Sequence, residues 1–332
     1  MSQGSGCTEP IGTFAQAIEL ELGTGPAAEL RDSASLLSQL YRFEPKPGIS
    51  RGLDSGQLQA YLATRAPATF AATRRVLTEL ARSRPGWAPK SLADLGAGPG
   101  TASWAAVSVF PSIERAFVVE ADKDMAALGS RLARSASSSV LAQSAWTIGD
   151  AATVPVQTCD LVVAAYLLGE IGHDREPEAL ERWWRATSGA LVLVEPGTPA
   201  GFERLRAARS RLISWGAHVL APCPHDDLCP MEGADWCHFA VRLERSSLHR
   251  DLKSARLGYE DEKHSYVVVS ADRPSTHFSR LVRSPRPRKG HVRLVVCENG
   301  GLNERVISRR DGEVYKRARN AGWGDRLELP DR

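Results

Sequence analysis

The segment Asp94-Leu-Gly-Ala-Gly-Pro-Gly100 constrains the fold of this 332-residue chain more than any other. It directly follows a short apolar run at 91–95 and precedes a stretch at 102–110 that can form a helix. Glycine at a strand-to-helix turn lets the backbone approach a ligand closely, where a Cβ atom would collide. A glycine triplet alone is a weak signal, but this placement predicts a nucleotide-binding turn in a parallel sheet.

Short apolar runs alternate with helix-length segments along the middle of the chain. The predicted strands are 91–95, 116–120, 161–166 and 191–195, and the predicted helices between them are 102–110, 123–136 and 176–187. Such alternation predicts parallel βαβ units and a doubly wound α/β sheet. Two later apolar runs, 265–271 and 291–297, are candidates for the sixth and seventh strands of this sheet.

These patterns divide the chain into four predicted segments. Residues 1–88 are expected to form an N-terminal helical domain and residues 89–220 a Rossmann-like core. Residues 221–240 are a cysteine-rich insertion. Residues 241–332 contain the remaining strands, a fourth cysteine and a basic tail.

The spacing within the glycine segment distinguishes between two kinds of nucleotide site. Dinucleotide-binding turns use Gly-x-Gly-x-x-Gly, whereas Asp94, Gly96, Gly98 and Gly100 stand at alternate positions. This arrangement resembles the S-adenosylmethionine loop of class I methyltransferases. The resemblance implies that Asp94 meets the positively charged methionine end of the donor, directly or through water.

Further residues are candidates for the same donor site. Glu120 ends the second predicted strand, where a carboxylate can accept hydrogen bonds from both ribose hydroxyls. Asp150 lies where such enzymes commonly place an acid near the adenine amino group. In the alternative interpretation, Glu120 is a solvated strand end and Asp150 a turn residue. Tyr166 and Glu170 are candidates for lining the pocket, or equally for packing or helix capping.

The segment Ala164-Ala-Tyr-Leu-Leu-Gly-Glu170, after the fourth predicted strand, carries no catalytic signature. Base methyltransferases that act on amino groups resemble one another in an Asn/Asp-Pro-Pro-aromatic motif at this place. Enzymes that act on a cytosine carbon need a positioned cysteine, but Cys159 lies at the opposite end of the strand. We therefore predict no catalytic residue.

Four cysteines have a spacing that indicates a metal centre: Cys223-x5-Cys229-x7-Cys237, followed after 59 residues by Cys297. Four thiolates suit either tetrahedral zinc or a cubane iron–sulfur cluster. Zinc sites usually have closer Cys-x2–4-Cys pairs, so the wide spacing favours iron–sulfur. His225 and His238 leave a mixed Cys/His zinc site open. The alternative is that the four are unrelated buried thiols.

Charge and hydropathy indicate the partners and the compartment. Between 280 and 319 there are twelve Lys or Arg residues against four Asp or Glu, although the net charge of the whole chain is +3. Such a segment is expected to contact nucleic-acid phosphates; the alternative is a solvated face. No apolar stretch approaches the roughly 20 residues needed to span a bilayer. The first ten residues lack a secretory signal, so we expect a cytoplasmic protein with reduced thiols.

Several segments together resemble the methyltransferase-like assembly factors of the mitochondrial ribosomal small subunit and their bacterial relatives. The similarity begins near residue 40. The matching pieces are Ala60-Tyr-Leu-Ala-Thr-Arg-Ala-Pro-Ala-Thr-Phe70, the 94–100 loop, Leu168-Gly-Glu170, Val194-Glu-Pro-Gly-Thr-Pro199, the Cys-Pro-His and Trp-Cys-His-Phe segments, the 290–297 segment and the 315–325 tail. The resemblance implies a class I methyltransferase fold and association with small-subunit ribosomal RNA. It also implies a 4Fe-4S cluster on Cys223, Cys229, Cys237 and Cys297.

The sequence therefore predicts an α/β protein with a class I S-adenosylmethionine-dependent methyltransferase sheet, an N-terminal helical domain and a cysteine-rich metal-binding insertion. The expected partner is small-subunit ribosomal RNA or its precursor particle, and we expect a monomer. The expected cofactors are S-adenosylmethionine and a 4Fe-4S cluster, with zinc as the alternative metal. Three functions remain open: an rRNA methyltransferase, a non-catalytic RNA-binding assembly factor, and a small-molecule methyltransferase.

Overall fold

The computed structural model describes residues 10–23, 27–42, 48, 51–253, 255–274 and 278–329. Residues 1–9, on which most of the prediction about a secretory signal depends, lie outside this part. Within the described residues, none of the helices has both the length and the apolar character that a membrane span requires.

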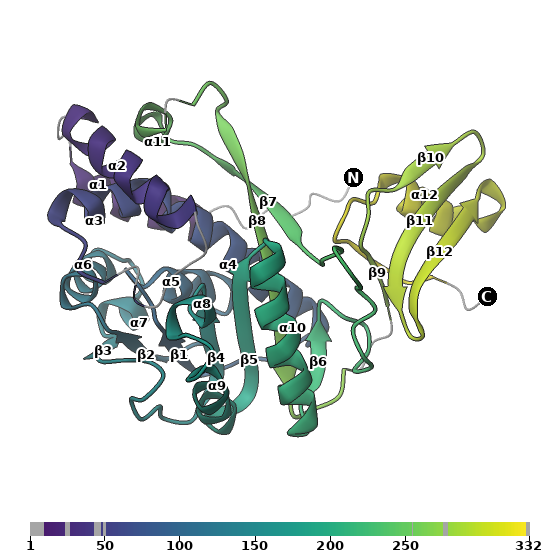
Figure 1. Ribbon diagram of the computed structural model, residues 1–332, viewed down its shortest axis with the longest axis horizontal. Helices are drawn as coiled ribbons and strands as arrows, with labels where there is room; N and C mark the ends of the chain where they lie inside the picture. Colours follow the sequence, from purple (N-terminus) through teal and green to yellow (C-terminus); the bar gives the residue numbers. More distant parts are fainter. Residues whose placement is uncertain are drawn as a thin grey trace.

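A large mixed sheet forms the centre of the molecule (Figure 1). Its strands run in the order β3-β2-β1-β4-β5-β8-β6, and β7 also pairs with β8. The bounds are β1 Ser91–Leu95, β2 Arg115–Glu120, β3 Ala145–Ile148, β4 Cys159–Ala165, β5 Thr187–Pro196, β6 His218–Ala221, β7 Phe239–Glu244 and β8 Tyr259–Ser270. The first five strands are mutually parallel, whereas β8 is antiparallel to both β5 and β6. The predicted α/β sheet is thus present, with an antiparallel strand where the sequence predicted a sixth strand.

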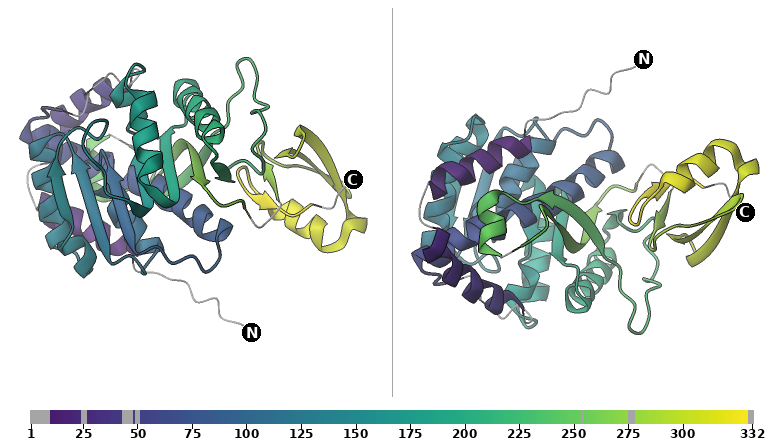
Figure 2. Two further views of the ribbon diagram at one scale, coloured as in Figure 1. Left: turned by 90° about the horizontal axis from the view of Figure 1, so that it is seen from below. Right: turned by 90° about the horizontal axis from the view of Figure 1, so that it is seen from above.

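Helices cover both faces of this sheet (Figure 2). Successive strand residues point to opposite faces, so Leu92 and Leu161 belong to one apolar core while Ala93 and Val162 belong to the other. The first core contains α1 Pro10–Leu22, α2 Ala27–Arg42, α3 Ser55–Thr64, α4 Ala66–Ser83, α5 Thr101–Val109, α6 Lys123–Arg134 and α7 Ser139–Ala142. The second contains α8 Leu168–Ile171, α9 Glu176–Arg185 and α10 Pro199–Ser214. The N-terminal helices α1–α4 therefore share a core with the sheet.

A second, smaller sheet follows at the C-terminal end. It contains β9 Ser279–Leu281, β10 Arg286–Arg288, β11 His291–Glu298, β12 Gly301–Ser308 and β13 Arg326–Leu327, with the short helix η1 Arg309–Asp311 and α12 Gly312–Asn320 after β12. We call residues 279–329 the C-terminal unit. It projects from the side of the large sheet (Figures 1 and 2) and has its own small apolar core.

The prediction that 291–297 is a seventh strand of the large sheet is wrong, because β11 belongs to the C-terminal unit. Along β11 the buried Val292 and Leu294 alternate with the partly exposed His291 and the exposed Arg293. Alternation of this kind is typical of an antiparallel strand with one solvated face. A strand covered by helices on both faces is apolar throughout, as Leu161–Ala164 is in β4.

Candidate functional site

A cleft of about 700 Å³ opens at the carboxyl ends of the parallel strands. The strand order reverses between β1 and β4, and ligands of open α/β sheets bind at such a switch point. Five of the seven residues predicted to bind the donor line this cleft: Gly96, Gly98, Glu120, Asp150 and Tyr166. Glu170 lines it as well.

The glycine segment turns sharply between β1 and α5. Gly96, Gly98 and Gly100 all have positive φ, at 63°, 56° and 81°, and glycine adopts this conformation without steric cost. A Cβ atom at Gly96 would lie 2.5 Å from Cδ1 of Leu167, another residue of the cleft. Gly100 does not line the cleft. It is the residue immediately before α5, where its positive φ lets the helix begin, and a Cβ atom there would lie 3.3 Å from the Trp146 ring.

Asp94 also lies away from the cleft lining. Its side chain is almost completely buried and accepts hydrogen bonds from the Ser103 backbone N–H and from the Ser103 hydroxyl, both at 2.7 Å. Burial raises the pKa of Asp94 to about 6, against the lowering effect of the two hydrogen bonds. Asp94 therefore fixes α5 to β1, and its position gives it no contact surface within the cleft.

The two other predicted acids lie in the cleft and already have protein partners. Glu120 accepts hydrogen bonds from the backbone N–H groups of Gly98 and Asp122, each at 2.8 Å, and burial raises its pKa. Asp150 accepts hydrogen bonds from Arg175 at 2.7 Å and from Arg51 at 3.2 Å. Burial opposes ionisation of Asp150, but the bonds from Arg175 and its other donors hold its pKa below the usual range. Two arginines thus approach the acid expected to meet adenine.

Tyr166, directly after β4, has an unusual backbone conformation. Its φ of 60° makes it the non-glycine residue with positive φ within the described part of the chain. Such conformations are costly for bulky residues and cluster at functional sites. The hydroxyl of Tyr166 donates a hydrogen bond to Glu262 on β8 at 3.0 Å. The ring is thereby held over the cleft by a contact to the antiparallel strand.

Several cleft residues were not predicted as site residues. Tyr61 lies on α3, Arg65 between α3 and α4, and Thr69 on α4, while Glu262 and Lys263 lie on β8. A signal for the first three existed, since they fall within the 60–70 stretch that carries the family resemblance. Glu262 and Lys263 stand immediately before the apolar part of β8, which gave no sign of a ligand.

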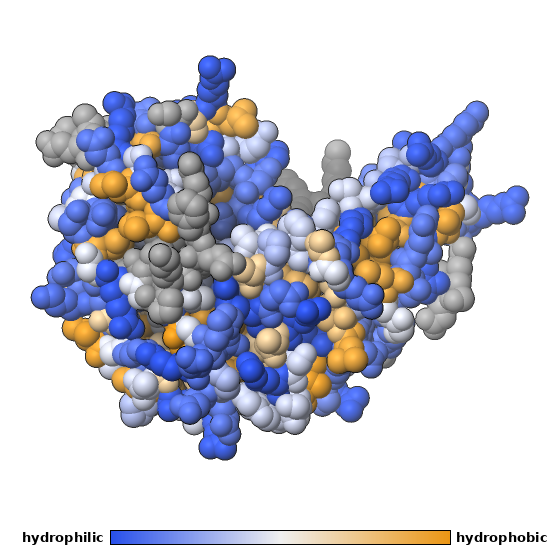
Figure 3. Space-filling view, viewed as in Figure 1, coloured by the Kyte–Doolittle hydropathy of each residue, from blue (hydrophilic) through white to orange (hydrophobic). Residues whose placement is uncertain are grey.

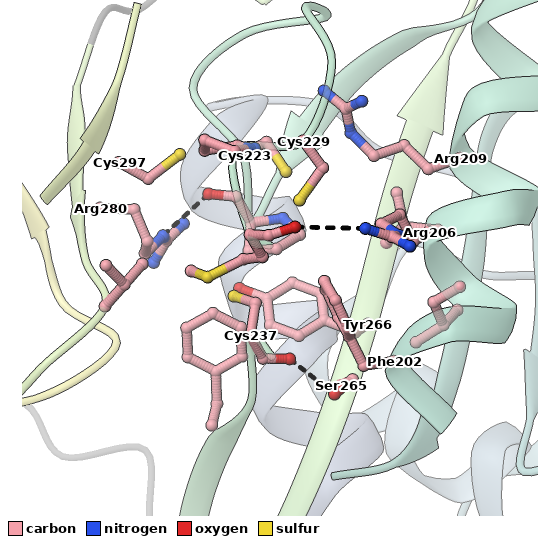
Figure 4. A pocket seen from close by; sticks show the side chains of 17 residues that line it. Phe202, Arg206, Arg209, Cys223, Cys229, Cys237, Ser265, Tyr266, Arg280 and Cys297 are labelled. Carbon is pink, nitrogen blue, oxygen red and sulfur yellow. Dashed lines mark hydrogen bonds between the residues drawn. The ribbon is translucent and has the colours of Figure 1, made fainter. Parts of the chain in front are cut away.

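The four predicted metal-binding cysteines line one cavity of about 40 Å³ (Figure 4). Cys223 follows β6, Cys229 and Cys237 lie in the loop before β7, and Cys297 lies on β11. The 223–237 segment and β11 are distant in sequence and meet at this point. His238 stands outside the cavity lining, where its ring stacks on Trp236 at 5.1 Å.

The cavity is lined by thiols and apolar side chains. All four cysteines are free, and burial raises the pKa of Cys297 to about 12 and those of Cys229 and Cys237 above their usual value. Within the described ranges, no group of three or more histidine, cysteine or acidic side chains is arranged to hold a metal ion. The four cysteines thus share one cavity lining.

Buried nitrogen atoms surround the same cavity. Arg280 donates to the Pro222 carbonyl at 2.9 Å and to Glu79 at 3.0 Å, while its Nη2 has no partner among the residues that the structure describes. Arg209 donates to the His225 carbonyl at 2.7 Å, while its Nε has none among the same residues. The Nε2 atom of His225 lies 3.4 Å from Sγ of Cys297.

The C-terminal unit carries a basic face, which we define by Arg286, Arg288, His291 and Arg293. Arg286 lies directly opposite Arg293, and Arg288 opposite His291, so these side chains share one face of the small sheet. The face lies opposite the core residues Val292 and Leu294. Cys297 lies on the same face of β11 as Arg293, because their positions differ by an even number. The side of this unit that is visible in Figure 3 carries hydrophilic residues interspersed with hydrophobic patches.

The large sheet and its cleft can be compared with known structures. Magnesium protoporphyrin IX methyltransferase (ChlM) from Synechocystis PCC 6803, solved with bound SAM, is similar with a TM-score of 0.42 and 10% identity, over 75% of this chain and 100% of that one. Other similar solved structures are also methyltransferases.

Sequence relatives are more informative. The chain is 30% identical over 293 residues to the human "Ribosome assembly protein METTL17, mitochondrial", covering 81% of this chain and 62% of that protein. It is 25% identical over 354 residues to the "Rsm22-cox11 tandem protein 2, mitochondrial" of Schizosaccharomyces pombe, covering 91% of this chain and 47% of that one. The chain thus spans less than two thirds of the length of these curated relatives.

A family model matches residues 56–328, which is well over half of the chain, and its description is "Mitochondrial small ribosomal subunit Rsm22". The resemblance inferred from the sequence motifs is thereby confirmed. This protein belongs to the Rsm22 family.

Proposed function

We propose that this protein binds S-adenosylmethionine in the cleft and small-subunit ribosomal RNA, or its precursor particle, on the C-terminal unit during assembly of the small ribosomal subunit. The family description and the name of the human relative support a role in assembly. The observation that carries the proposal is the position of Cys297. This residue lines the cysteine cavity and lies on the same sheet face as Arg293, so it connects the cavity to the basic face.

The basic face supports an anionic partner. Like charges directly opposite one another on a sheet destabilise it, yet Arg286 stands opposite Arg293. Glu304 lies 3.6 Å from Arg293 and offsets part of this charge. Phosphate groups of RNA placed between the two arginines would relieve the remaining repulsion.

We further propose that Cys223, Cys229, Cys237 and Cys297 hold a 4Fe-4S cluster, with zinc as the alternative metal. Four thiols that line one cavity suit either group. The wide spacing of these cysteines in the sequence favours the cluster over zinc, whose sites usually have closer Cys-x2–4-Cys pairs. The buried arginines Arg209 and Arg280 fit a group of net negative charge. Such a cluster would join the insertion to the C-terminal unit and could exchange one electron.

For the donor, Glu120 is proposed to accept the ribose hydroxyls and Asp150 the adenine amino group, with Gly96 and Gly98 next to the methionine end. Tyr166 would lie near the sulfonium. Asp94 and Gly100 act through the shape of the loop, since neither lines the cleft. Transfer of a methyl group from a sulfonium depends mainly on in-line positioning, so the lack of a recognisable base does not exclude catalysis.

A non-catalytic assembly factor is the second candidate. Two observations favour it: the Tyr166 hydroxyl is already bonded to Glu262, and Asp150 is held by Arg51 and Arg175. Transfer of tritium from labelled donor to immature small subunits separates the two candidates. Donor binding without transfer would favour the scaffold. A small-molecule methyltransferase would bind RNA weakly, with little dependence on salt.

The compartment follows from the partner. The relatives named above are mitochondrial proteins, so the cytoplasmic location predicted from the sequence does not follow from the family. We propose that the protein works wherever its small subunits are assembled. Fractionation of the cells that produce it, with the small-subunit RNA as marker, tests this.

The main experiment compares Cys237→Ser with Cys159→Ser after purification without oxygen. Cys159 is a free, buried cysteine of β4 that lies away from the cavity lining. We expect the wild type and Cys159→Ser to show the visible absorption of an iron–sulfur cluster and to bind small-subunit RNA. Cys237→Ser should lose the absorption, melt at lower temperature and bind RNA more weakly. A colourless wild-type protein that contains zinc would contradict the iron–sulfur part, and unchanged RNA affinity in Cys237→Ser would contradict the link to RNA.

A further inference from the structure

Three side chains beside the cysteines, Arg209, Arg280 and His225, carry hydrogen-bond donors to which the function proposed so far gives no role. Arg209 and Arg280 are among the buried residues, with 4% and 1% of their surface exposed, and His225 is buried as well. Among the described residues, Nε of Arg209 and Nη2 of Arg280 have no hydrogen-bond partner. A buried donor without a partner costs roughly 1–3 kcal/mol, and more when it is charged. The arrangement therefore calls for an acceptor.

The cavity itself is where such an acceptor would lie. Arg209 and Arg280 both line it together with the four cysteines. They approach from opposite sides, Arg280 beside Cys297 and Arg209 near Cys229 (Figure 4). His225 contacts a sulfur directly, with Nε2 at 3.4 Å from Sγ of Cys297. With a free thiol, the S–H group donates to Nε2; once Cys297 is a thiolate ligand, its sulfur is an acceptor and Nε2 carries the proton.

We propose that His225 donates an N–H···S hydrogen bond to ligated Cys297, that Arg209 and Arg280 present N–H groups to the sulfurs of the same cavity, and that these three donors raise the reduction potential of the bound group. This inference rests on the proposed cluster. Reduction adds one electron to the group and leaves its four thiolates in place. The extra negative charge is stabilised by the donors more strongly than the oxidised state is, and hydrogen bonds to sulfur are an established determinant of cluster potentials.

The structure offers matched variants for this test. His225→Leu removes the ring nitrogens, whereas His225→Gln keeps an N–H group near the position of Nε2. His238→Leu is the control, because His238 is also close to a cysteine in sequence but lies outside the cavity lining, stacked on Trp236 and tilted against Trp323. Arg209→Lys keeps the positive charge and removes the Nε–H group. Arg280 is less suitable for substitution, since it also bonds Glu79 and two carbonyl groups.

The experiment is a dithionite titration of the oxygen-free proteins with redox mediators, followed by electron paramagnetic resonance. We expect His225→Leu to have a more negative midpoint potential than the wild type, and Arg209→Lys to shift in the same direction. His225→Gln and His238→Leu should stay close to the wild type. An unchanged potential in His225→Leu overturns the inference and leaves the proposed cluster intact. A wild-type protein without a cluster overturns both.

A second measurement decides the matter if His225→Leu fails to load a cluster. In the reduced wild type labelled with 15N-histidine, electron–nuclear double resonance should detect a histidine nitrogen and an exchangeable proton coupled to the group. The exchangeable coupling should disappear in deuterated water. Absence of any histidine coupling in the loaded wild type overturns the inference.

Discussion

Asp94 shows at the scale of one residue how a motif position can serve the fold before it serves a ligand. The spacing of the glycine segment correctly placed this acid at the end of β1, but its carboxylate faces Ser103 at the start of α5. Its distance from the cleft could not be predicted, because the same Asp-x-Gly-x-Gly-x-Gly pattern is compatible with either orientation of the side chain.

The buried state of Asp94 predicts a pH dependence of stability. Its folded pKa of about 6 lies above the ordinary value of 3.8. Its stabilising contribution is therefore fully present below about pH 4 and is lost as pH rises through about 6. Two pKa units correspond to roughly 3 kcal/mol. From pH 4 to pH 7 the free energy of unfolding of the wild type should fall by about this amount relative to Asp94→Asn, as urea titrations can measure. A constant difference between the two proteins would contradict this.

Alanine at Gly96 should weaken donor binding through an effect that alanine at Gly98 does not have. Both have positive φ, so alanine at either position should cost about 1 kcal/mol or more in stability. At Gly96 the added Cβ would also displace Leu167, whose Cδ1 lies 2.5 Å away, whereas at Gly98 the nearest atom is 3.7 Å away. Leu167 would move into the cleft. Calorimetry should show at least about a tenfold loss of donor affinity, worth 1.4 kcal/mol, for Gly96→Ala. Adding Leu167→Ala should recover part of it; equal affinities for the two glycine variants would exclude this effect.

At the scale of helices and strands, the continuous apolar runs were the most predictable parts. The runs at 161–166 and 191–195 correspond to β4 and β5, which are buried on both faces. The edge strand β3 was missed because its four residues are mostly exposed and mixed in polarity. The half-exposed β7 was missed for a similar reason, whereas β6 is mostly buried but only four residues long. β11 was assigned to the wrong sheet. The hydropathy of a strand therefore predicts how buried the strand is better than it predicts which strands it pairs with.

The pairing of β10 with β11 predicts how RNA binding responds to salt. Replacing Arg286 and Arg288 with glutamate should lower the affinity for small-subunit RNA. The slope of log affinity against log salt should become shallower by roughly 0.7–0.9 for each phosphate that the variant no longer neutralises. Thermal stability should not fall, since the change also removes the repulsion between Arg286 and Arg293. Arg185→Glu, an exposed position on α9 far from this sheet in sequence, is the control and should leave the slope unchanged. If the double variant keeps the wild-type slope, the basic face does not contact RNA.

At the scale of the whole molecule, one buried ion pair connects the C-terminal unit to the large sheet domain. Glu79 on α4 contacts Arg280 on β9 at 3.0 Å, and both side chains are almost fully buried. Nothing in the sequence pairs two residues that are 201 positions apart. The cysteines were different, because thiols are uncommon and their clustering in a reduced protein is informative, so their convergence could be predicted.

This ion pair predicts a strong and non-additive effect on stability. Glu79→Gln leaves the Arg280 charge buried without its partner, which should cost roughly 3–5 kcal/mol. The double variant Glu79→Gln/Arg280→Gln should cost less than the sum of the two single variants, because their effects are coupled. Arg84→Gln, which breaks a pair with the largely exposed Asp272, should cost less than about 1 kcal/mol. Additive costs in chemical denaturation would argue against the coupling.

The antiparallel strand β8 contributes to both candidate sites: Glu262 and Lys263 line the cleft, and Ser265 and Tyr266 line the cysteine cavity. The indole of Trp236, next to Cys237, also donates a hydrogen bond to the carbonyl of Gly197, which lines the cleft. This is a second connection between the two sites. A ligand that shifts β8 at one site therefore also moves residues that line the other site. By thermodynamic linkage, if the bound metal group changes the affinity of the cleft for a nucleoside by some factor, the nucleoside changes the affinity of the cavity for the metal group by the same factor.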